Sequence, residues 1–106
     1  MEGIPNEERI IDKSEVVNEI KTKGIEGLGV KELVERWTIE QEKNVEQVGT
    51  AEASINFNID RADLYLATGD KEGALEALED ARLQAYQEGN IELYNKIMTR
   101  MDEIES

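Results

Sequence analysis

The chain has 106 residues, enough for one domain but not for a second hydrophobic core, and its 39% hydrophobic content suffices to fill one. Its 25 acidic residues outnumber the 12 Lys and Arg, so the formal net charge is -13, which argues against direct binding to nucleic-acid phosphates or anionic membranes. Cysteine and histidine are absent, which excludes disulfides, thiolate metal sites and histidine-based catalysis.

The N-terminal stretch MEGIPNEERIID is acidic and has no apolar run, so it lacks the features of a secretory signal. No stretch of the chain approaches the roughly 18 apolar residues that a membrane helix requires. We therefore expect a cytoplasmic protein in which residues 1–11 form a disordered segment and residues 12–106 form a single helical domain. Pro5 is the only proline, and no Gly/Ser-rich linker divides the chain further.

The first predicted helix covers about residues 12–23. Asp12 and Glu15 have the spacing of a capping box, and Gly24 offers a C-terminal stop. The stretch GIEGLG that follows predicts a loop, which we expect to tuck Ile25 or Leu28 against the body of the domain.

The second predicted helix runs from Val30 to about residue 48, and a third follows after Thr50, a suitable N-cap, and extends to Gly69. The second helix carries an apolar stripe at Leu33, Val34, Trp37, Val45 and Val48, and the third carries one at Ile55, Ile59, Ala62 and Leu66. The stretch SINFNID also alternates as a strand would. Helix is favoured, because the stripe continues through RADLYLA and a lone strand would have no partner.

Two more helices are predicted after the caps Asp70 and Asn90. The fourth helix, 71–87, has an alanine-rich stripe at Ala74, Leu78, Ala81 and Ala85, and the fifth has a face at Ile91, Tyr94, Met98, Met101 and Ile104. Small side chains suit a face where another helix axis comes close. The short connection TGD places the third and fourth helices side by side and antiparallel. The predicted architecture is all-α, a compact bundle of about five helices that contains a tight αα-hairpin.

The stretch from Ile55 to about Glu88 resembles one repeat of the tetratricopeptide family. The residues at the spacing of that family are Ala62, Tyr65, Gly69, Asp70, Ala74, Leu78 and Ala81. The pattern departs from the family at Asn58, Arg61 and Tyr86, where an aromatic residue, a leucine and a proline are usual. No second copy stands at the expected period. Plain helix-bundle packing without repeat ancestry explains the alanines equally well.

The resemblance implies a partner-binding groove lined by the first helix of the hairpin. The residues at those positions are Asn56, Ile59, Asp63 and Leu66. The alternative is that this face is covered by residues 30–48. Trp37, the only tryptophan, is expected to be a core anchor, and its alternative role is a partly exposed binding residue.

Catalytic chemistry has little support in the residues. The only serines are Ser14, Ser54 and Ser106, and pairs of carboxylates such as Glu76 and Asp80 have the pattern of a solvated helix face. No calcium loop or phosphate-binding loop is found, so we expect neither an enzyme nor a metal or other cofactor.

Two functional hypotheses follow. The first is a small acidic protein–protein interaction domain, an adaptor or regulatory module whose partner is a basic or amphipathic helix or a second copy of the chain. The second is an acidic inhibitor that mimics nucleic acid and binds a basic nucleic-acid-binding protein.

Overall fold

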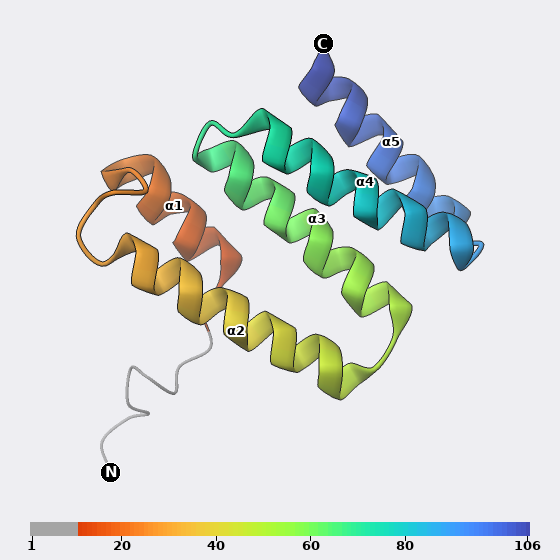
Figure 1. Ribbon diagram of the computed structural model, residues 1–106, viewed down its shortest axis with the longest axis horizontal. Coiled ribbons are helices and arrows are strands. Elements are labelled where there is room, and N and C mark those ends of the chain that lie inside the picture. The colour runs from red at the N-terminus through yellow and green to blue at the C-terminus, as the bar shows by residue number, and fades with distance from the viewer. Residues whose placement is uncertain (1–10) are drawn as a thin grey trace.

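Five helices joined by short connections make up the computed structural model, which describes residues 11–106 (Figure 1). They are α1 (Lys13–Lys23), α2 (Val30–Val48), α3 (Ala51–Ala67), α4 (Lys71–Gln87) and α5 (Ile91–Glu105). No strand occurs among the described residues, so the all-α prediction is confirmed and SINFNID is helical. None of these helices is long and apolar enough to cross a membrane.

The expectation of disorder near the N-terminus falls on residues 1–10, which lie outside the described part of the chain. Ile11, which the prediction placed in the same segment, is 1% exposed. Its backbone N–H donates to Glu40 Oε1 of α2 at 3.0 Å. The folded domain therefore includes Ile11.

The last three helices begin with caps that are 20 residues apart. Thr50, Asp70 and Asn90 each accept a hydrogen bond through a side-chain oxygen from the backbone N–H three residues later. Before each of these caps, a glycine adopts the left-handed conformation that lets one helix end and the next begin without a longer loop; these are Gly49 (φ 69°), Gly69 (φ 83°) and Gly89 (φ 69°). The capping box predicted for α1 does not form, because the Asp12 side chain makes no capping hydrogen bond.

The alanine-rich face of α4 lies in the core, as predicted. Ala74, Leu78, Ala81 and Ala85 are fully buried, and Ala77 is almost so. They form one cluster with residues of α3 and α5, and the contact between α3 and α4 is the most extensive in the molecule. Methyl side chains on this face allow the two helix axes to approach closely.

A second buried cluster joins α1, α2 and α3 (Figure 1). Helix α1 contacts both α2 and α3 and contributes Val16 and Ile20 to this cluster. Trp37 of α2 is 1% exposed within it, which confirms the core position, and Leu64 supplies the contribution of α3. The interior therefore consists of two clusters that share α3, rather than the single core expected from the chain length.

Two details of the predicted burial are wrong. Ile91, on the predicted face of α5, is 66% exposed, and Val48, at the end of the α2 stripe, is also exposed. The fully buried side chains of α5 are Leu93 and Ile97. The residues of the predicted α5 face that pack partly buried against the first cluster are Tyr94, Met101 and Ile104.

The expectation that Ile25 or Leu28 packs against the domain is confirmed for Ile25. In the loop between α1 and α2, Ile25 packs against the second cluster, whereas Leu28 is 95% exposed.

Candidate functional site

The face of α3 that the resemblance identified as a groove lies between α1 and α5. Asn56 is exposed at its beginning, whereas Ile59 is only 6% exposed and packs in the cluster with α4 and α5. Leu66 is half-buried and lines a hollow of about 380 Å³ with residues of α1. The residues that cover this face belong to α1 and α5, not to residues 30–48 as the alternative had it.

Asp63 is held between two cations at the centre of this face. Lys13 Nζ of α1 lies 2.7 Å from Asp63 Oδ2 and 3.2 Å from Asp60 Oδ1, and Arg100 of α5 pairs with Asp63 Oδ1. Burial alone would raise the pKa of Asp63, but the hydrogen bonds and positive charges of Lys13 and Arg100 outweigh it and lower that pKa. The carboxylate therefore ties three helices together, which is a structural role.

Replacement of Asp63 by asparagine is expected to lower the free energy of unfolding by about 1–2 kcal/mol at neutral pH, because two half-buried cations lose their shared carboxylate. Since the pKa is lower in the folded chain, this contribution is present above the ordinary value of 3.8 and is lost as the pH falls through the folded pKa. Urea unfolding should therefore show a constant difference between wild type and variant from about pH 5 to pH 8, which shrinks below about pH 4. The exposed exchange Asp102→Asn is the control. A difference for Asp63→Asn that does not depend on pH in the acid range would contradict this role.

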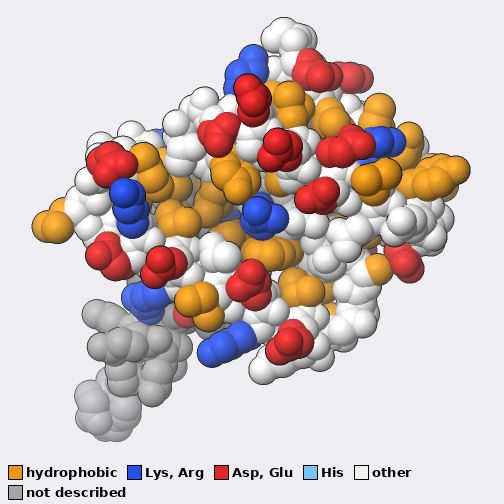
Figure 2. Space-filling model, viewed as in Figure 1, with side chains coloured by type: hydrophobic (Ala, Val, Ile, Leu, Met, Phe, Trp, Pro, Cys, Tyr) orange, Lys and Arg blue, Asp and Glu red, His pale blue; other side chains and the backbone are white. Residues whose placement is uncertain are grey.

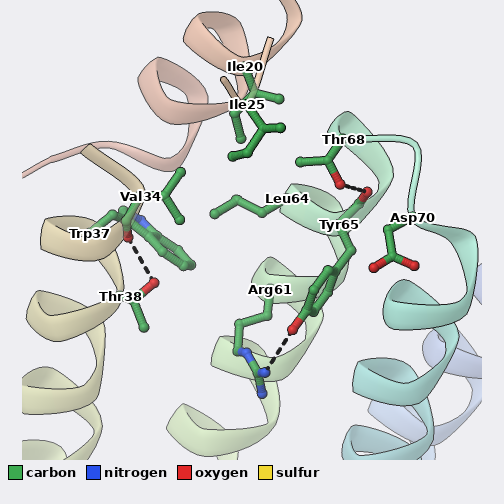
Figure 3. Close-up of a pocket in the computed structure, with 10 residues that line it drawn as sticks. All are labelled: Ile20, Ile25, Val34, Trp37, Thr38, Arg61, Leu64, Tyr65, Thr68 and Asp70. Atoms are coloured by element: carbon green, nitrogen blue, oxygen red, sulfur yellow. Dashed lines mark hydrogen bonds between the residues drawn. The ribbon is translucent and has the colours of Figure 1, made fainter. Parts of the chain in front are cut away.

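A hollow with a mainly apolar lining lies on the other side of α3, between α1, the loop after it, α2 and α3 (Figure 3). Its volume is about 410 Å³. The lining residues are Ile20, Ile25, Val34, Trp37, Thr38, Arg61, Leu64, Tyr65, Thr68 and Asp70. Trp37 and Leu64 are at the same time members of the second buried cluster, so the core fixes the inner wall of the hollow.

Tyr65 forms part of the hollow because of how α4 begins. A Cβ atom built on Gly73 would lie 2.8 Å from Cδ1 of the Tyr65 ring and 2.7 Å from Oδ2 of Asp70, so only glycine lets the ring pack there. Asp70 caps α4 through Oδ1, which accepts from the backbone N–H of Gly73 at 2.8 Å. The start of α4 thus positions two of the residues that line the hollow.

Among residues 11–106, Arg61 is the only basic residue in the lining of this hollow. Its Nη1 donates to Asn58 Oδ1 at 3.2 Å, and its Nη2 donates to Tyr65 Oη at 3.3 Å. Its Cζ also lies 5.9 Å and 5.8 Å from the ring centroids of Phe57 and Tyr65, within the range of cation–π attraction. Two aromatic rings and an amide therefore hold the guanidinium in place.

A shallower hollow extends this surface across α2. It shares Ile25, Val34 and Thr38 with the first, and it continues to Ile39, which is half-exposed. Thr38 stands between the two, with its hydroxyl donating to the Val34 carbonyl oxygen at 2.8 Å. Together the two hollows form a continuous surface with a mainly apolar lining, which we call the α2–α3 surface.

On the face that Figure 2 presents, charged side chains are distributed rather than collected in one row. Figure 2 shows acidic and basic side chains interspersed with hydrophobic ones on the face that it presents. Within residues 11–106, no group of three or more acidic side chains is arranged to hold a metal ion. Glu76 and Asp80, the example of a carboxylate pair, are both exposed.

Comparisons with known proteins give no relative for this chain: no family model, no curated protein and no solved structure matches it.

The sequence prediction included Trp37 but missed the rest of the α2–α3 surface. Residues Phe57, Arg61 and Tyr65 stand four apart on one helix, and this spacing was a signal that an arginine is held between two aromatic rings. No comparable local pattern in the sequence indicates that α1, α2 and α3 pack together.

Proposed function

We propose that this chain is a small, non-catalytic protein-interaction module of the cytoplasm, an adaptor or regulatory domain, which holds an apolar segment of a partner protein on its α2–α3 surface. The observation that carries the proposal is the hollow of about 410 Å³, lined mainly by apolar side chains. Binding sites of this kind are concave, mostly apolar and equipped with a few polar groups that fix orientation.

The rigidity of the hollow supports this assignment. Trp37 and Leu64 are buried in the core, so the inner wall does not have to be ordered when a partner binds. Tyr65, Arg61 and Asp70 add polar groups on one side. We retain the tetratricopeptide-like hairpin as part of the proposal and assign it to α3 and α4. The proposed binding site is the α2–α3 surface, and not the groove that the resemblance implies.

Capture from a lysate of the organism that encodes the chain tests the proposal when elution is resolved by salt. The partner should stay bound at about 1 M salt, where charge interactions are screened within about 3 Å, because apolar contact holds it. Thr38→Glu, which places a charge and additional bulk in the α2–α3 surface, should abolish retention. Thr99→Glu is a matched control, because Thr99 also donates to a carbonyl oxygen four residues earlier, Asn95 O at 3.0 Å, but lies exposed on α5.

The acidic-inhibitor hypothesis predicts a different elution. A basic nucleic-acid-binding protein would be released at modest salt, and the Thr38→Glu variant would retain it as well as wild type does. That outcome, or retention at high salt that is unaffected by Thr38→Glu, would show that the partner does not bind at the α2–α3 surface.

A further inference from the structure

We propose that the segment bound on the α2–α3 surface carries an acidic side chain, whose carboxylate binds the Arg61 guanidinium while neighbouring apolar side chains fill the hollow. This inference rests on the proposed function and specifies the chemistry of the partner segment.

Arg61 is distinguished by neutral side chains that hold its guanidinium in place. Ion pairs with carboxylates are formed by Lys13, Lys23, Lys31, Arg82 and Arg100. Within residues 11–106 no carboxylate forms an ion pair with Arg61, whose contacts are the Asn58 amide, the Tyr65 hydroxyl and two aromatic rings. Four lysines, which are Lys21, Lys43, Lys71 and Lys96, also form no ion pair among the described residues, but only Arg61 is fixed by two hydrogen bonds and two aromatic rings.

The geometry of Arg61 leaves room for a carboxylate. A guanidinium has five N–H donors, and the two hydrogen bonds to Asn58 and Tyr65 engage one on each terminal nitrogen. The remaining donors match the two oxygens of a carboxylate, which arginine binds in a planar, bidentate arrangement. The rings of Phe57 and Tyr65 hold the group in place, so little side-chain entropy is lost on binding.

Local charge favours this ligand although the molecule as a whole is acidic. At physiological ionic strength charges are screened beyond about 8 Å, so the net charge of -13 acts weakly on a group that touches Arg61. Asp70, the acidic residue of the hollow, is engaged as the cap of α4, and Tyr65 lies between it and Arg61 in Figure 3. An apolar segment bound against these walls would exclude water, which would strengthen a charge pair formed beside it.

The test is selection of a random peptide library displayed on phage against the wild-type chain. The peptides are fused through their C-terminal ends, so that no free terminal carboxylate is presented. We expect the selected peptides to combine apolar residues with an Asp or Glu that is enriched several-fold over the unselected library. A selected peptide should lose affinity about tenfold or more on the Arg61→Met variant, the change expected for loss of a charge-assisted hydrogen-bonded pair.

A double-mutant cycle separates direct pairing from a change in the fold. Exchange of the acidic peptide residue for its amide should weaken binding to wild type by a similar factor and have no effect on binding to Arg61→Met. Arg82→Met is the matched control, since Arg82 pairs with Glu79 on α4 and does not line either hollow. Circular dichroism verifies that each variant is folded.

Each other outcome overturns the inference. An apolar consensus without acidic residues, or with basic ones, would refute the role of Arg61 while the proposed function stands. Failure to select any peptide, or equal binding to Thr38→Glu, would refute both. A dimer in sedimentation velocity that Thr38→Glu dissociates would show that a second copy of the chain occupies the surface.

Discussion

Replacement of Trp37 by alanine is expected to lower the free energy of unfolding by about 3–5 kcal/mol, a large part of the stability of a domain of this size. The indole is 1% exposed and packs where α1, α2 and α3 meet, with the Phe57 ring centroid 5.9 Å from its own. Its removal leaves a cavity that three helices would have to close. Because Trp37 is the only tryptophan, urea unfolding is best followed by far-ultraviolet circular dichroism.

Tyr86→Ala is the control for that experiment, because this aromatic side chain is 72% exposed at the end of α4. Its loss should change the free energy of unfolding by no more than about 0.5 kcal/mol. Similar effects of the two substitutions would contradict the packing of α2 against α1 and α3.

Replacement of Ala81 by leucine should also destabilise the chain, by about 1–3 kcal/mol, although leucine is itself a good helix former. Ala81 is fully buried where α4 packs against α3 and α5, and three extra carbon atoms there must push the helices apart. The measurement is again urea unfolding. It tests directly whether methyl side chains set the distance between α3 and α4.

Glu76→Leu provides the comparison for Ala81→Leu, because it introduces the same side chain at an exposed position of the same helix. We expect a change within about 0.5 kcal/mol. If Ala81→Leu leaves the stability unchanged or raises it, the hairpin contains unfilled space and the close approach of its helices has another cause.

The helices were predictable from the sequence because their signals are local. Thr50, Asp70 and Asn90 are capping residues that follow glycines, and the alanines of α4 repeat at helical spacing. The spacing of 20 residues between the three caps is a further local signal, because it indicates that consecutive helices have similar lengths.

The site was less predictable because it depends on contacts between distant residues. Lys13 and Asp63 are 50 residues apart, and no local pattern indicates that α1 rather than α2 covers that face of α3. The burial of Leu93 in place of Ile91 on α5 was unpredictable for a related reason, since both are apolar residues in the first turn and only packing decides which of them is buried.

The division of the interior into two clusters has a consequence for how the chain opens. Helices α1 and α2 join the rest through limited contact with α3, whereas α3 and α4 share the most extensive contact in the molecule. In native-state hydrogen exchange, we therefore expect the amides of α1 and α2 to exchange together, with a lower free energy of opening than those of α3–α5. The hollow has one wall in each unit, so the partner segment that we propose would contact both units at once. Its binding would then stabilise α1 and α2 against local unfolding.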